Sequence, residues 1–182
     1  MGAGLRRHEV KLGFSLLETM LAVGVSAVLA NTVLPPLIGA INDSRLRAEA
    51  YGLYAVLNTA RMTAIVRNQP IVVCRATVDK AGATHCGGID RRWTQGLIAY
   101  SNSNPNRGFQ SDADIPIGSR LTFRQHTEVD LEAPCGSITF LPDGRVNTAE
   151  TIKFEIRDRR GAASARRVSL SPRGQLTLSR AL

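Results

Sequence analysis

The chain has 182 residues, with 23 Lys and Arg against 15 Asp and Glu, which gives a formal net charge of +8. Once an apolar segment near the N-terminus is set aside, about 140 residues remain, the usual size of one domain. A domain of that size buries a sound core, so its folding needs no metal or disulfide. The basic charge favours nucleic acid or anionic lipid headgroups as partners and leaves the fold open.

Residues 14–41 form an apolar run that contains no basic residue and one acid, Glu18. As a helix this run is about 40 Å long, enough to cross a hydrocarbon core of roughly 30 Å. An acid at the centre of a membrane helix costs about 2.5–3.5 kcal/mol, and less near one end. Glu18 therefore needs a positively charged partner. Pro35 and Pro36 are expected to bend or interrupt the helix, because proline removes a backbone donor.

Residues 1–13 are too short and too polar for a domain, and they carry three basic side chains against one acid. Such a leader holds the N-terminus in the cytoplasm under the positive-inside rule. A cut between Gly13 and Phe14 gives Phe14 a free amine, four residues before Glu18. That amine is suited to neutralise the carboxylate of a neighbouring copy. The expected organisation is a leader over 1–13, a transmembrane helix over 14–41 and a domain over 42–182.

Residues 11–18, Lys-Leu-Gly-Phe-Ser-Leu-Leu-Glu, resemble the processing site of type IV prepilins and type II secretion pseudopilins. The resemblance implies that a prepilin peptidase cuts after Gly13 and methylates Phe14. It also implies that Glu18 guides assembly with other pilin subunits, and that Pro35 is the helix-kinking proline found in many pilins. Leu12 departs from the usual basic residue before the glycine.

Two other interpretations of the N-terminus stay open. One is a plain signal anchor, in which Glu18 is incidental. The other is a secretory signal peptide cut after Ala30, where small residues suit the cleavage rule. Both leave an acid inside an apolar region that has no use for it.

A second helical stretch is predicted from a capping segment at 42–44 to about Asn68. Apolar residues recur there at three- and four-residue steps, which indicates one packed face: Leu46, Ala50, Leu53, Tyr54, Leu57, Ala60, Ala64 and Ile65. Beyond Pro70 the period changes, and seven strands are predicted: 71–76, 92–100, 120–124, 137–141, 151–157, 166–171 and 175–179. Loops are expected at 79–90 and 101–116. A long helix packed on an antiparallel sheet is an α+β arrangement.

This order of features resembles the GspH/FimT group of minor pilins and pseudopilins over nearly the whole chain. The resemblance rests on the segments 72–74, 93–100, 138–140 and 143–145, with Cys86 between the first two. It implies a pilin-like fold and a single-pass protein of the inner membrane whose C-terminal domain lies in the periplasm. It further implies a subunit that primes assembly or lies at the tip of a type IV pilus or a type II secretion pseudopilus. Such a subunit takes part in protein secretion.

The chain has three cysteines, Cys74, Cys86 and Cys135, which this topology places outside the cytoplasm, where disulfides persist. Cys74 and Cys86 flank a polar turn that contains glycine, so they are the expected pair, worth about 3 kcal/mol in the chain-entropy model. Cys135 is then unpaired or replaces Cys86. A zinc site is the alternative for these thiols, but no CxxC or well-spaced His supports it.

No catalytic constellation is visible in the sequence. His85 and His126 have no neighbouring Ser or Cys signature, and Asp112 and Asp114 lie outside any EF-hand pattern. There is neither a P-loop nor a Rossmann fingerprint. We therefore expect no enzyme activity, no metal and no cofactor.

The C-terminal third is strongly basic, with eight Lys and Arg against two acids from Thr151 onward. Clustered arginines are an electrostatic footprint for double-stranded DNA. FimT-like members of the group bind DNA for uptake through a C-terminal Gly-Arg-x-Arg, but the matching stretch here, 174–177, is Gly-Gln-Leu-Thr. The candidate DNA-binding residues are Arg157, Arg159, Arg160 and Arg173. DNA uptake is thus the alternative function, and the competing interpretation is a solvated turn whose charges pair with neighbouring subunits.

Overall fold

The structure is a computed structural model that describes residues 13–78, 84–87, 92–101, 115–117, 121–123, 127–131 and 136–180. The chain forms two compact units, residues 1–42 and residues 43–182. Cys135, His126, Asp112 and Asp114 lie outside the described residues, as do residues 1–12.

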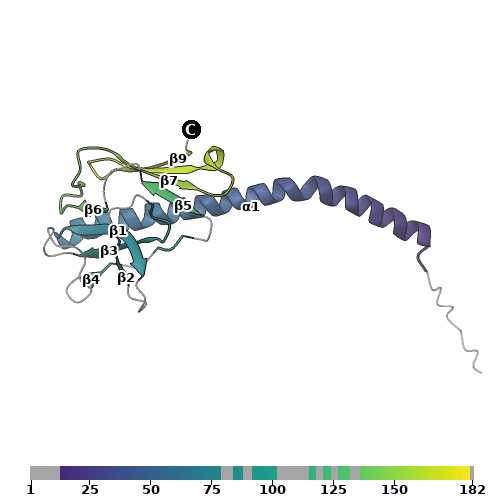
Figure 1. The fold of residues 1–182 in the computed structure, drawn as a ribbon, viewed down its shortest axis with the longest axis horizontal. Coiled ribbons are helices and arrows are strands. Elements are labelled where there is room, and N and C mark those ends of the chain that lie inside the picture. Colours follow the sequence, from purple (N-terminus) through teal and green to yellow (C-terminus); the bar gives the residue numbers. More distant parts are fainter. Residues whose placement is uncertain are drawn as a thin grey trace, which may run out of the picture. The chain divides into compact units, whose positions relative to one another are not determined.

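Helix α1, Leu16–Arg67, contributes to both units and is the long N-terminal helix that the sequence predicts (Figure 1). It is continuous through Pro35 and Pro36, so the expected second start at 42–44 is absent and one helix replaces two. A kink at Pro35 stays a prediction. The helix ends in a Schellman motif: Asn68 adopts a left-handed conformation, and the Gln69 amide donates to the Ala64 carbonyl at 3.2 Å.

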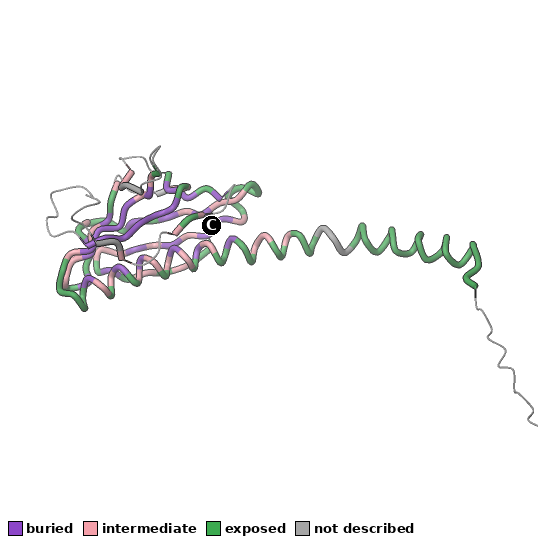
Figure 2. The backbone as a smooth tube through the Cα atoms, turned by 90° about the horizontal axis from the view of Figure 1, so that it is seen from below, coloured by how far each residue is buried: buried purple, intermediate pink, exposed green. Residues whose placement is uncertain are grey.

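Within residues 43–182, the buried face of α1 follows the predicted spacing. Its fully buried side chains are Leu46, Ala50, Leu53, Leu57, Ala60 and Ala64. They belong to one hydrophobic core with buried residues of both sheets, and Figure 2 shows this alternation of buried and exposed turns along the tube. The predicted amphipathic helix is confirmed, with Tyr54 and Ile65 less buried than the rest.

The first sheet is antiparallel and has the order β2-β1-β3-β4, and β6 also pairs with β1, on the edge opposite β3. Its strands are β1 (Ile71–Val78), β2 (Thr84–Cys86), β3 (Leu97–Ser101), β4 (Ile115–Pro116) and β6 (Ser137–Phe140). In β1, Ile71 and Val73 join the main core, whereas Val72 and Cys74 belong to a second cluster with Ile98. The sheet is therefore apolar on both faces along β1.

The second sheet is also antiparallel, with the order β5-β7-β8-β9. Its strands are β5 (Glu128–Leu131), β7 (Ile152–Arg157), β8 (Arg166–Leu170) and β9 (Leu176–Arg180), and a short 3-10 helix, η1 (Ala162–Ser164), precedes β8. Phe154 of β7 is fully buried and meets the Trp93 ring edge-on, with ring centroids 5.5 Å apart. This contact links the segment before β3 to the second sheet.

The strand predictions are confirmed for β1, β6, β7, β8 and β9 within two residues at each end. The strand predicted at 92–100 is shorter, because the chain turns at Gly96, which has a φ of 103°. The strand predicted at 120–124 is wrong for its described residues: Leu121 forms one isolated bridge with Leu97. Strands β2 and β4 lie in segments predicted as loops, and β5 was not predicted.

Candidate functional site

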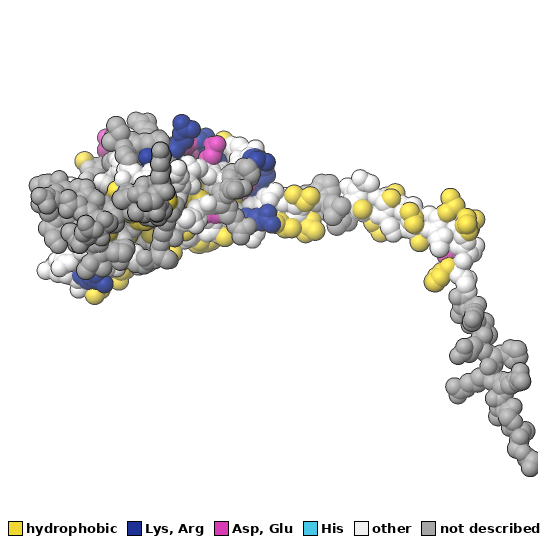
Figure 3. All heavy atoms as spheres, turned by 60° about the horizontal axis from the view of Figure 1, so that its bottom comes forward, with side chains coloured by type: hydrophobic (Ala, Val, Ile, Leu, Met, Phe, Trp, Pro, Cys, Tyr) yellow, Lys and Arg dark blue, Asp and Glu magenta, His cyan; other side chains and the backbone are white. Residues whose placement is uncertain are grey.

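The first candidate site is the surface of α1 over residues 16–42. The large apolar side chains described there are all exposed, and Figure 3 shows hydrophobic side chains along this part of the helix: Leu16, Leu17, Met20, Leu21, Val23, Val25, Val28, Leu29, Leu37, Ile38 and Ile41. By length and composition, α1 is able to cross a membrane. The surface therefore matches an apolar solvent or the helices of other subunits, and not water.

Polar side chains in this part of α1 are turned back onto the helix backbone. The hydroxyls of Thr19 and Ser26 donate to the carbonyls of Leu16 and Ala22 at 2.8 and 2.7 Å, and the Asn31 amide donates to the Ala27 carbonyl at 2.9 Å. These bonds satisfy donors that a hydrocarbon environment would leave unpaired. The helix is thus compatible with lipid despite its polar residues.

Glu18 is the acid of the first turn of α1, and its amide donates to the Ser15 carbonyl at 3.0 Å. The first turn is where the helix dipole favours a negative charge. Gly13 and Phe14 precede the helix, and Phe14 is 81% exposed. The peptide bond between them therefore lies in non-helical backbone, as a peptidase substrate requires. Cleavage, methylation and the assembly role of Glu18 stay predictions.

The four arginines that we proposed for DNA binding lie at two different ends of the second sheet. The strand register places Arg157 and the loop that carries Arg159 and Arg160 at one end of the second sheet. Arg173 lies in the turn between β8 and β9, at the other end. The strands between them have five or six residues, which separates the two ends by about 17 Å. The four residues do not form one contiguous patch.

Two of these arginines, Arg157 and Arg160, are paired with carboxylates. Arg157 pairs with Asp130 of β5 and lies 3.9 Å from Glu155. Arg160 pairs with Asp158 at 2.7 Å, and the Ser164 hydroxyl donates to the same carboxylate at 3.1 Å. Burial raises the pKa of Asp158, but the bonds from Arg160 and Ser164 outweigh it and hold that pKa below its ordinary value. The contacts of Asp158 with Arg160 and Ser164 therefore stabilise the conformation of this loop.

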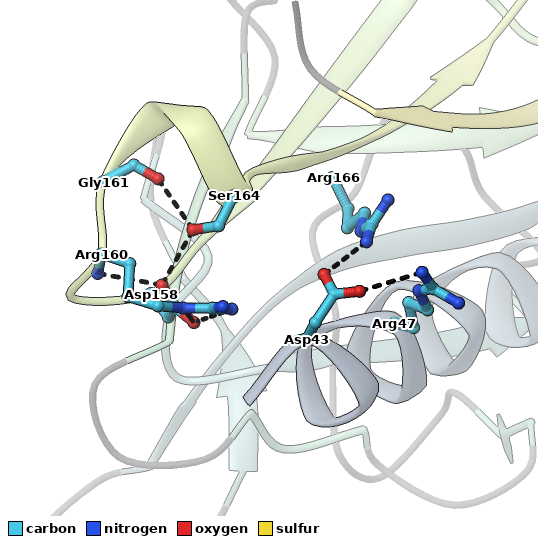
Figure 4. A network of polar contacts seen from close by, with 7 residues as sticks. All are labelled: Asp43, Arg47, Asp158, Arg160, Gly161, Ser164 and Arg166. Atoms are coloured by element: carbon cyan, nitrogen blue, oxygen red, sulfur yellow. Dashed lines mark hydrogen bonds and ion pairs between the residues drawn. The ribbon is translucent and has the colours of Figure 1, made fainter. Parts of the chain in front are cut away.

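Sequence analysis missed a basic cluster around Asp43 of α1, which Figure 4 shows. The Asp43 carboxylate accepts from Arg166 of β8 at 2.5 Å and pairs with Arg47, one turn along the helix, at 2.9 Å. The hydrogen bond from Arg166, together with the charges of Arg47 and Arg180, holds the pKa of Asp43 below its ordinary value. The four-residue spacing of Asp43 and Arg47 is visible in the sequence, but the approach of Arg166 is not.

The opposite end of the second sheet is built by two glycine turns and one arginine. The Arg61 guanidinium of α1 donates from Nε to the Gly144 carbonyl at 3.0 Å. A Cβ on Gly174 would overlap that same carbonyl oxygen and would lie 2.7 Å from Arg61 Nε. Gly174, the glycine that aligns with the Gly-Arg-x-Arg position, is therefore required here by packing and by its φ of 77°.

The structure contains the expected disulfide between Cys74 of β1 and Cys86 of β2, whose Cα atoms are 5.6 Å apart. The Cys86 sulfur also lies 3.6 Å from the Tyr100 hydroxyl. Among the described residues no group of three His, Cys, Asp or Glu is placed to hold a metal ion. The disulfide therefore has a structural role in joining the short β2 to the sheet.

Comparison with known proteins gives a family match and structural neighbours. The family described as type II transport protein GspH matches residues 49–174 of the chain. No curated protein matches the chain. The family match begins within the amphipathic part of α1, covers the strands from β1 to β8 and ends before β9.

Two solved structures share the fold. The type IV minor pilin FimU of Pseudomonas aeruginosa has a TM-score of 0.58 at 19% identity, covering 75% of this chain and 89% of that one. The minor pseudopilin EpsH of the type 2 secretion system of Vibrio cholerae has a TM-score of 0.50 at 17% identity, covering 75% of this chain and 97% of that one. The pilin-like α+β fold predicted from the sequence is confirmed.

Proposed function

This chain belongs to the family of the type II transport protein GspH, minor pilins and pseudopilins that are structural and not enzymatic, and we propose that it acts in priming or at the tip of such a filament. In this proposal the subunit enters the inner membrane as a precursor with its C-terminal domain in the periplasm. A prepilin peptidase removes residues 1–13 and methylates Phe14. The subunit then joins other pilins and serves protein secretion or pilus biogenesis.

One observation carries the proposal: an apolar helix with exposed side chains is joined to a compact domain and has a single acid in its first turn. Burial of that helix among other helices removes the apolar surface from contact with lipid or water. The carboxylate of Glu18 then needs a cation in an environment of low dielectric constant. The amine released at Phe14 of an adjacent subunit supplies that charge.

The test is Glu18→Ala in the cells that produce the filament. We expect normal membrane insertion and cleavage but a strong loss of incorporation into the filament, because the subunit no longer attracts the neighbouring amine. Glu49→Ala is the matched control, since it removes an acid from the same helix within the folded domain. Incorporation is measured by immunoblot of sheared or overexpressed filaments.

Mass spectrometry of the same material tests processing. We expect the mature chain to begin with methylated Phe14. An intact N-terminus, or a start after Ala30, contradicts the proposal, as does normal filament incorporation of the Glu18→Ala subunit.

DNA uptake is the alternative function. It predicts salt-dependent binding of duplex DNA that is lost when Arg157, Arg159 and Arg160 are replaced by Ala. The support for it is the basic character of the loop after β7. A gel shift without any complex at low salt excludes it.

A further inference from the structure

A basic pocket lies where α1 passes the ends of β8 and β9. It has a volume of about 240 Å³, and its polar lining comes from Arg47 and Tyr51 of α1, Arg166 of β8, and Ser179 and Arg180 of β9. Arg166 and Arg180 are directly opposite each other in the register of the two strands. Three guanidinium groups that are distant in the sequence therefore surround one small space.

The pocket has more positive than negative charge. Among the described residues, Asp43 is the carboxylate that pairs with this group, through Arg166 and Arg47. It neutralises one of the three guanidinium groups, which leaves two positive charges beside the pocket. Arg47 and Arg180 are exposed at its mouth, so an anionic ligand can reach them.

Arg166 is the buried member of the three arginines, with a side chain that is 9% exposed. Its Nε has almost no accessible surface, so the pocket contacts other atoms of this side chain. Arg166 therefore contributes a positive charge that is held in place by its pair with Asp43.

The position of the pocket in the chain indicates the source of the anion. Arg47 is six residues beyond Ile41, the last residue of the apolar run, and Asp43 is two beyond it. Basic side chains and tyrosines next to a membrane helix lie at the depth of the lipid headgroups. Tyr51, 61% exposed, has the amphipathic ring suited to that region.

We propose that this pocket binds the phosphate of an anionic phospholipid headgroup while the subunit is in the membrane. The inference rests on the proposed function in one respect, that residues 14–41 span the inner membrane. A guanidinium group binds phosphate in a bidentate manner, through two parallel hydrogen bonds. A small pocket of about 240 Å³ suits one headgroup, whereas duplex DNA requires contacts along a track of phosphates. Release from the lipid then accompanies transfer of the subunit into the filament.

The experiment measures thermal unfolding of the purified full chain in a neutral detergent. Four probes are added separately: short-chain phosphatidylglycerol, short-chain phosphatidylcholine, inorganic phosphate and a DNA duplex. We expect phosphatidylglycerol at ten times its Kd to raise the unfolding temperature by about 3–5 °C. Phosphatidylcholine and inorganic phosphate are expected to have little effect, since one lacks net charge and the other lacks the lipid.

The test variant is the double substitution Arg47→Gln and Arg180→Gln, which removes the exposed charges of the pocket and leaves the buried Arg166–Asp43 pair. The matched control is Arg145→Gln with Arg173→Gln, two exposed arginines at the opposite end of the sheet with the same change in net charge. We expect the shift with phosphatidylglycerol to disappear in the first double variant and to persist in the second.

Four outcomes overturn the proposal. No shift with phosphatidylglycerol, or an equal loss in both double variants, means that no specific site exists. An equal shift with inorganic phosphate assigns the pocket to a soluble anion. A DNA complex lost only in the Arg47 and Arg180 variant assigns it to nucleic acid. Because the detergent assay needs no cleavage at Gly13, failure here and failure of the processing test are distinguishable.

Discussion

The two halves of helix α1 use the same backbone in different ways. Over residues 16–42 the large apolar side chains that the structure describes are exposed, and apolar residues occur on all sides. Over residues 43–67 one face of the helix is buried, and six of its apolar residues pack against the sheets, while Tyr51 and Val66 are exposed. The second half is stabilised within the chain, whereas the large apolar side chains described in the first half are all exposed.

This difference shows which contacts stabilise each half of the helix. Burial of apolar area is worth about 25 cal/mol per Å², so the second half gains stability when the domain folds. The first half gains the same kind of stability only from lipid or from other subunits. Substitutions in the two halves are therefore expected to affect different measurements, namely unfolding of the domain and assembly of the filament.

The largest expected effect is in the core that the second half covers. Phe154→Ala removes a fully buried ring that contacts Trp93, and we expect it to lower the free energy of unfolding by about 3–5 kcal/mol. Denaturant unfolding of the full chain in neutral detergent measures this. Leu21→Ala in the exposed half is the control and is expected to leave the transition unchanged. An equal loss in the free energy of unfolding from Leu21→Ala would contradict the difference between the two halves of α1.

The next effect concerns the disulfide at the edge of the first sheet. Cys86→Ala opens a loop closed by residues 12 apart, and we expect a loss of about 3 kcal/mol in the free energy of unfolding. Wild-type protein under reducing conditions should match the variant. Cys135→Ala is the comparison: if it causes the loss and Cys86→Ala does not, then Cys135 is the partner of Cys74.

The third prediction concerns the close packing of the turns at Gly144 and Gly174. Gly174→Ala introduces a Cβ against the Gly144 carbonyl at a positive φ, and we expect a cost of about 2–3 kcal/mol. Gly161→Ala is the matched control, because Gly161 also has a positive φ but open space around its Cβ position. A smaller cost, about 1 kcal/mol, is expected there. Equal thermal shifts for both variants would show that the close packing of the two turns contributes nothing.

The smallest effect is at the start of the second half of α1 and depends on pH. The pKa of Asp43 is below its ordinary value of 3.8 in the folded chain, mainly through the hydrogen bond from Arg166. Its contribution is therefore fully present above that value and is lost as the pH falls through the lower folded pKa. Asp43→Asn should flatten the acid limb of a stability profile at pH values below the ordinary pKa of 3.8. Asp143→Asn, in an exposed turn at the other end, gives the reference for a local pair.

The sequence by itself determined the features that repeat over short distances. The apolar run with Glu18, the three- and four-residue spacing from Leu46 to Ala64, the Cys74–Cys86 pair and the glycine turns at Gly144 and Gly174 are all local patterns. Periodicity and turn chemistry act between near neighbours, so they can be predicted without knowing the fold.

Only the tertiary structure decided which distant residues meet. Strand β5 has four residues and two acids, and its place follows from pairing with β7 and from the contact of Asp130 with Arg157. The proposed DNA arginines are divided because β7, β8 and β9 run back and forth between two ends of a sheet. Arg166 reaches Asp43 across 123 residues of sequence. Contacts of that separation depend on how helix and sheet pack together, which no local pattern specifies.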